Sequence, residues 1–142
     1  MGNLQSLEFI LRAYLYNIVS KRMNKIDFYS LQIGLEIEED EFTNYDSLGK
    51  LINKFNEQMK NEKSKEIDKS IVEVRDALAH GRIASLDSSS RPHLIKYSRP
   101  NNGKVRVEFN EQLTKEWFKK YIESTNEALM IVEGELTKLT KD

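Results

Sequence analysis

The chain has 142 residues, no cysteine and a net charge of −1. This length suits one domain that buries a core without disulfides, and the lack of cysteine excludes disulfides and thiolate metal sites. The sequence shows no basic leader before an apolar segment and no apolar run long enough to cross a bilayer. We therefore expect a cytoplasmic protein without a membrane partner.

The charge is distributed unevenly. Residues 36–46 carry six acids and no base, whereas residues 75–106 carry seven bases and two acids, a net charge of +5. A segregated basic stretch attracts anionic ligands even when the net charge is near zero. A solvated surface of uneven charge is the alternative interpretation. The acidic stretch predicts a mobile loop, with a basic partner or shielding of the basic stretch as alternatives.

Three segments show apolar residues at helical spacing before residue 82. The first covers residues 4–22, and the second follows Asp46-Ser47, whose side chains can cap a helix. The third follows Ser64 as its expected cap and ends at Gly81, where we expect the left-handed conformation that glycine adopts easily. The expected buried stripes are Leu4, Leu7, Leu11, Tyr14 or Leu15, and Ile18; then Leu48, Leu51, Ile52, Phe55 and Met59; then Ile67, Ile71, Val74 and Leu78.

The pattern changes after Pro92. Apolar and polar residues alternate on both sides of Asn102-Gly103, a strong turn dipeptide, which predicts a β-hairpin over about residues 93–109. Its valine and phenylalanine face is expected to pack on the helices or on a partner. Residues 111–139 predict a long helix whose stripe is Leu113, Trp117, Tyr121, Ala128, Val132, Leu136 and Leu139.

Four helices with one hairpin before the last predict a mainly α protein, a helical bundle formed by residues 1–142 as a single domain. The last helix is long for a compact bundle of this size. Either its overhanging end or its opposite side can pack on a second copy. That opposite side carries Phe118, Ile122, Leu129 and Ile131.

The end of the third predicted helix contains the residues best suited to chemistry. Arg75 and His80 lie about 140° apart on an ideal helix, whereas Asp76 and His80 can be neighbours. A histidine transfers protons near neutral pH, and an arginine stabilises the charge that develops on a phosphate. This combination suits cleavage of RNA, which supplies its own 2′-hydroxyl nucleophile. The residues alone equally allow a last-turn histidine that caps free carbonyl groups beside a surface arginine.

The segment Arg75-Asp76-Ala-Leu-Ala-His80 resembles the R-x₄₋₆-H motif of the HEPN superfamily, in which an Asn, Asp or His commonly follows the arginine. The resemblance implies a four- or five-helix bundle with the motif near the end of its third main helix. It also implies a metal-independent endoribonuclease whose two protomers form one composite site, leaving 2′,3′-cyclic phosphate and 5′-hydroxyl ends. Many such proteins are toxins or abortive-infection effectors that act against phage.

One position departs from a HEPN subgroup. Toxins paired with nucleotidyltransferase antitoxins carry a tyrosine two residues after the histidine, where this chain has Arg82. We therefore expect neither that subgroup nor tyrosine modification there, and Arg82 becomes a candidate phosphate contact. Lys96, Lys104 and Arg106 are further candidates on one face of the hairpin, although a solvated strand face explains them equally well.

The other candidates have weaker support. For His93 we expect a surface or packing role in preference to catalysis. For Trp117 and Tyr121 we expect core packing in preference to base stacking.

The leading hypothesis is a dimeric HEPN ribonuclease with His80 as general acid or base, Arg75 on the phosphate and Asp76 orienting one of them. Its partners would be RNA, a second copy and an antitoxin or regulatory protein, with no metal or other cofactor. The alternative hypothesis is a non-catalytic HEPN module that binds RNA or a partner protein and mediates dimerisation. A third is a helical adaptor without nucleic acid.

Overall fold

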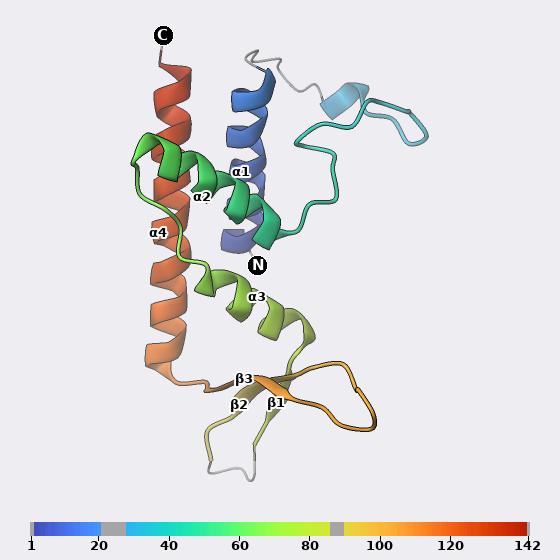
Figure 1. Ribbon diagram of the computed structural model, residues 1–142, viewed down its shortest axis with the longest axis vertical. Helices are drawn as coiled ribbons and strands as arrows, with labels where there is room; N and C mark the ends of the chain where they lie inside the picture. Colours follow the sequence, from blue (N-terminus) through green and yellow to red (C-terminus); the bar gives the residue numbers. More distant parts are fainter. Residues whose placement is uncertain (1, 21–27, 86–89, 142) are drawn as a thin grey trace. The chain divides into compact units, whose positions relative to one another are not determined.

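The computed structural model describes residues 2–20, 28–85 and 90–141 (Figure 1). The expected end of the first helix, at residues 21–22, lies outside them. The described chain is mainly α-helical with a small antiparallel sheet. In chain order, its elements are α1 (Gly2–Ser20), a 3₁₀ turn η1 (Phe28–Ser30), α2 (Leu48–Glu62), α3 (Ser70–His80), β1 (Arg82–Ala84), β2 (His93–Tyr97), β3 (Val107–Gln112) and α4 (Lys115–Thr140). No helix among these residues has the length and apolar character needed to cross a membrane.

The chain divides into two compact units, Met1–Ile67 with Leu129–Asp142, and Asp68–Ala128. In the first unit α1 packs against α2, and the apolar stripes expected for these helices largely form its core. The rings of Tyr14 and Phe55 meet edge to face, with 5.0 Å between their centroids. Burial, with Glu62 and Glu135 nearby, raises the pKa of Tyr14. Val132 of α4 is also fully buried, as expected.

Within the first unit, the C-terminal end of the acidic stretch is bonded to side chains of α1 and α2. The Arg12 side chain, 12% exposed, donates hydrogen bonds to the carbonyl oxygens of Glu41 and Asp46 and to Asn44 Oδ1, at 2.8–3.0 Å. Lys54 forms ion pairs with Asp46 and Glu41. Hydrogen bonds from Lys54 and Lys50 lower the pKa of Asp46. Glu41 and Asp46 therefore serve internal contacts, which the sequence pattern did not indicate.

The boundary between α2 and α3 differs from expectation. Ser47 caps α2 as predicted, its Oγ accepting from Lys50 N at 3.2 Å. The expected cap of the third helix at Ser64 is wrong, because α3 begins only at Ser70, after Asp68 accepts a hydrogen bond from its backbone N–H. The intervening chain is held by Asn56, whose buried amide donates to the Ile67 carbonyl at 2.9 Å and accepts from its N–H at 2.8 Å.

The second unit contains a three-stranded sheet in the order β1-β2-β3, all antiparallel, where one hairpin was expected. The predicted turn is confirmed, because Asn102 (φ 53°) and Gly103 (φ 73°) both adopt the positive φ that a two-residue hairpin turn requires. Strand β3 extends three residues past the expected end of the hairpin. Strand β1 was not predicted, because its three exposed residues show no alternation.

The apolar face of the hairpin is not the one expected. Leu94 is buried, whereas Val105 and Val107 are more than half exposed. A bulge between Lys96 and Tyr97 explains the difference, since Tyr97 pairs with Val107 while Lys96 pairs with Phe109. The extra residue places Val107 and Phe109 on opposite faces of the sheet.

The helices of the second unit also depart from their expected stripes. In α3 the buried residues are Ile71 and Ala77, whereas Leu78 is 44% exposed. In α4 the buried Thr125 is an unexpected core residue, and its hydroxyl donates to the carbonyls of Tyr121 and Ile122. Trp117 and Tyr121 are half-buried, so they are not the fully buried core residues that their spacing predicted.

Gly81 ends α3 in an extended conformation (φ −80°, ψ 179°), so the expected left-handed cap is wrong. A Cβ atom here would lie 2.3 Å from the Ala77 carbonyl oxygen and 3.0 Å from that of Ile95. The glycine is therefore required by a close approach of backbones, and this approach joins the end of α3 to β1 and β2.

Replacing Gly81 with alanine should lower the free energy of unfolding by about 1–3 kcal/mol, because the added methyl group overlaps two carbonyl oxygens. Gly134→Ala is the matched control, since nothing lies within 4 Å of that site and alanine is the better helix former by about 1 kcal/mol. Urea unfolding of both variants measures the effect. Equal stability of the two variants would contradict the close approach.

Asn56→Ala should cost about 2–4 kcal/mol of stability, because it leaves the buried N–H and C=O groups of Ile67 without partners. Asn53→Ala, at an exposed position of the same helix, should change stability by less than about 0.5 kcal/mol. Thermal unfolding followed by circular dichroism compares them. A small loss at Asn56 would mean that water replaces its hydrogen bonds.

Candidate functional site

The motif residues lie on the exposed side of α3 in the second unit. Arg75 donates from Nη1 to Asp76 Oδ1 at 3.1 Å, and both side chains are only partly covered. His80 is the last residue of the helix and is exposed. The three expected site residues are therefore all accessible to a large ligand such as RNA.

The structure does not bring Arg75 and His80 together within one chain. They are five positions apart on the helix, which corresponds to directions about 140° apart. Asp76 contacts Arg75, and no hydrogen bond or ion pair connects it to His80. One chain therefore presents the arginine and the histidine on different sides of α3.

The His80 side chain forms no hydrogen bond or ion pair with the part of the chain that the structure describes. The nearby carbonyl of Ala77 accepts a hydrogen bond from the Gly81 backbone N–H, at 2.7 Å. The structure thus shows no capping hydrogen bond from the imidazole to the end of α3. Both ring nitrogens are available for proton transfer or for binding a ligand.

Arg82 lies directly after this helix end, on what we call the outer face of the sheet: Arg82, His93, Ile95, Tyr97, Val107 and Asn110. Its guanidinium lies over the ring of Tyr97, with 6.0 Å from Cζ to the ring centroid. On the same face, His93 Nδ1 and Asn110 Oδ1 are 2.9 Å apart. The outer face therefore combines a cation with an exposed aromatic ring, the pairing on which unstacked bases bind.

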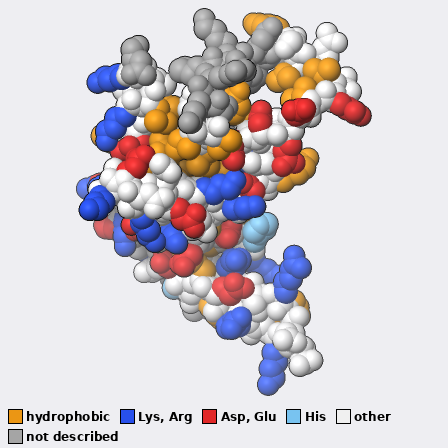
Figure 2. Space-filling model, turned by 45° about the horizontal axis from the view of Figure 1, so that its top comes forward, with side chains coloured by type: hydrophobic (Ala, Val, Ile, Leu, Met, Phe, Trp, Pro, Cys, Tyr) orange, Lys and Arg blue, Asp and Glu red, His pale blue; other side chains and the backbone are white. Residues whose placement is uncertain are grey.

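The other predicted RNA contacts are arranged differently. Lys96 lies on the opposite face with Leu94 and forms an ion pair with Glu108 at 3.6 Å. Lys104 belongs to the hairpin turn, where its backbone pairs with Asn101, and Arg106 follows two residues later. Figure 2 shows Lys and Arg side chains next to Asp and Glu side chains at several places on the drawn face. Arg82 and Lys96 thus do not form a common phosphate track.

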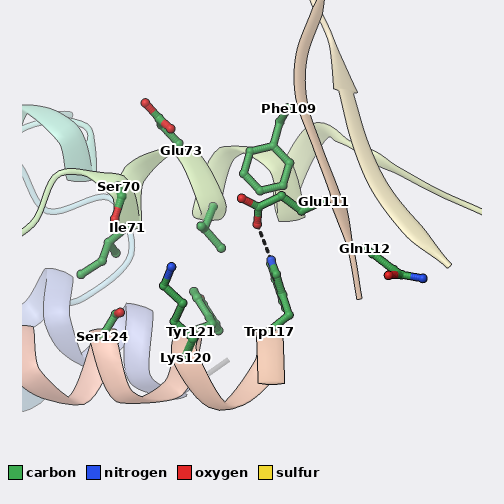
Figure 3. Close-up of a pocket in the computed structure, with 11 residues that line it drawn as sticks. Ser70, Ile71, Glu73, Phe109, Glu111, Gln112, Trp117, Lys120, Tyr121 and Ser124 are labelled. Carbon is green, nitrogen blue, oxygen red and sulfur yellow. Dashed lines mark hydrogen bonds between the residues drawn. The ribbon is translucent and has the colours of Figure 1, made fainter. Parts of the chain in front are cut away.

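A pocket of about 330 Å³ in the second unit was missed by sequence reasoning (Figure 3). Its wall includes Trp117 and Tyr121, which stack with 5.7 Å between centroids and 15° between planes. The Trp117 indole N–H donates to Glu111 of β3. Burial raises the pKa of Tyr121. Helical spacing had assigned these rings to the core, and only their position beside β3 reveals the pocket.

In the described residues, no group of three or more histidine, aspartate and glutamate side chains has an arrangement that could hold a metal ion. Comparison with known proteins finds no match to a protein-family model, a curated protein or a solved structure. The function is therefore inferred from the residues and their geometry.

Proposed function

We propose that this chain is a metal-independent endoribonuclease of HEPN type, acting in the cytoplasm as a toxin or an anti-phage defence effector. The observation that carries the proposal is the exposed end of α3, where His80 has no partner among the described residues and Arg82 follows within two residues. Arg75 and Asp76 lie one turn earlier on the same helix. An antitoxin or another regulatory protein would restrain this activity.

The proposed reaction uses the 2′-hydroxyl of RNA as the nucleophile. One imidazole takes the proton of this hydroxyl, and its oxygen bonds to the adjacent phosphorus. The bond from phosphorus to the 5′-oxygen breaks, and a second acid donates a proton to that oxygen. The products are a 2′,3′-cyclic phosphate and a 5′-hydroxyl. Arginine stabilises the charge on the non-bridging oxygens during the transfer.

A second copy of the chain supplies what one copy lacks. Each chain offers one His80 and an Arg75 that points to another side of α3. A general base, a general acid and an arginine at the phosphate therefore need two helix ends at one cleft. Phe118 and Ile122, four residues apart on α4, are 47% and 49% exposed and can contribute to such an interface. This proposal requires the active species to be a homodimer.

His80→Ala should lower RNA cleavage by about 10²–10⁴-fold, because one proton-transfer group is lost. The assay is cleavage of total RNA by the purified chain with EDTA present. Direct kinase labelling identifies the 5′-hydroxyl ends, and resistance to 3′-end ligation identifies the 2′,3′-cyclic phosphates. His93→Ala is the comparison variant, since His93 bonds to Asn110 and has no proposed role in proton transfer, so the cleavage rate at saturating RNA should be unchanged. Normal cleavage by His80→Ala would refute the assignment.

The second candidate function is a non-catalytic module that binds RNA or a partner protein and mediates dimerisation. The contact between Arg75 and Asp76 favours it, because the arginine already has an anionic partner. The pairing of Arg82 with Tyr97 offers a binding surface that needs no catalysis. RNA binding that weakens with salt, without cleavage, would support this function.

Under either function, Arg82→Ala should weaken binding of single-stranded RNA more than Lys96→Ala does. Arg82 is accessible on the outer face, whereas Lys96 is 24% exposed and paired with Glu108. Fluorescence anisotropy at several salt concentrations measures both, and loss of one phosphate contact should reduce the salt slope by about 0.7. A larger effect at Lys96 would place the RNA on the other face.

A further inference from the structure

The pocket shown in Figure 3 has the size and the walls of a site for a flat aromatic ligand. Its volume of about 330 Å³ falls within the range of small-molecule sites. Residues from α3, β3 and α4 line it, and all of them belong to the second unit. Its apolar walls come from Phe109, Trp117 and Tyr121 together with Ile71 and Val74.

The aromatic rings are held in position. Trp117 and Tyr121 are nearly parallel, and the hydrogen bond from the Trp117 indole to Glu111 fixes the orientation of the larger ring. Phe109 approaches from β3, on the side of the pocket opposite Trp117 (Figure 3). Rings that are fixed before binding offer a stacking surface at little entropic cost.

The polar groups around these rings suggest which base would bind. Glu111 uses Oε2 for Trp117, and its Oε1 accepts no hydrogen bond from the described residues. A carboxylate matches two adjacent N–H donors, and guanine is the RNA base whose Watson–Crick edge presents two such donors, N1–H and N2–H. Glu111 therefore offers guanine its Oε1 and the second lone pair of Oε2, beside the hydrogen bond from Trp117.

Lys120 provides a cation at the same pocket. It forms no ion pair within the described chain, whereas the neighbouring Lys119 points elsewhere and lies 3.9 Å from Glu123. The pocket is lined by two carboxylates, Glu73 and Glu111, and this one ammonium group. Lys120 can bind one phosphate, and the two carboxylates disfavour a polyphosphate.

We infer that this pocket binds an unpaired guanine, which stacks on Trp117 and Tyr121, donates hydrogen bonds to Glu111 and places its phosphate at Lys120. The inference rests on the proposed function, since RNA is the source of the base. It specifies the substrate class as single-stranded RNA that contains guanine. Guanine in a duplex does not fit, because its Watson–Crick edge is already paired.

Trp117 is the sole tryptophan of the chain, so its fluorescence reports directly on the pocket. We would titrate the intact chain with GMP, IMP, AMP, CMP and UMP. Saturable quenching by GMP is expected, with at least about fivefold weaker binding of IMP, which lacks the 2-amino donor, and of the other three nucleotides. Equal quenching by all five, or by none, would overturn the inference.

Matched variants test each contact. Glu111→Gln keeps an acceptor for Trp117 but loses the charge, and it should weaken GMP binding at least about tenfold. Lys120→Ala should weaken binding of GMP but not of guanosine, whereas Lys119→Ala should change neither. Circular dichroism verifies that each variant is folded. Unchanged GMP affinity in folded Glu111→Gln, or stronger quenching by free arginine than by GMP, would overturn the inference.

Failure of this inference is distinguishable from failure of the proposed function. GMP binding without RNA cleavage would support the guanine pocket and contradict the proposed ribonuclease activity. RNA cleavage that is abolished by His80→Ala, with no GMP binding, would support the ribonuclease activity and overturn the guanine-binding inference.

Discussion

The close approach of backbones at Gly81 is the constraint on which the candidate site depends. Because no Cβ is present, the end of α3 lies against the carbonyl of Ile95, and the helix passes directly into an edge strand. The residues on either side, His80 and Arg82, therefore lie at one junction between α3 and β1. One faces solvent at the helix end, and the other lies on the outer face of the sheet.

The geometry of α3 has a direct chemical consequence. An arginine and a histidine five positions apart on a helix point about 140° away from each other, and Asp76 contacts the arginine. Under the proposed function, catalysis therefore uses a second helix end, whereas binding does not need one. Both candidate functions include a homodimer, so RNA cleavage separates them, whereas the oligomeric state alone does not.

The second unit divides its potential RNA contacts between two surfaces. The outer face offers Arg82 beside Tyr97, and the pocket offers stacked rings with a carboxylate at their edge. Phosphate contacts position a nucleic acid, and contacts to base edges select its sequence. Under the proposed function, the outer face contributes binding affinity, and the pocket selects the base.

Local sequence signals determined much of this protein. Helical spacing identified the core of α1 and α2, Ser47 marked the start of α2, and Asn102-Gly103 marked the hairpin turn, because each depends on residues within one or two turns of chain. The position of the motif residues at the end of α3 was likewise identified locally. Strand β1, the bulge opposite Lys96 and the extended Gly81 were decided by tertiary structure, since each depends on backbone from another segment. The pocket could not be predicted for the same reason. Helical spacing shows that Trp117 and Tyr121 share one face of α4, but only the packing of β3 beside that face leaves it partly open.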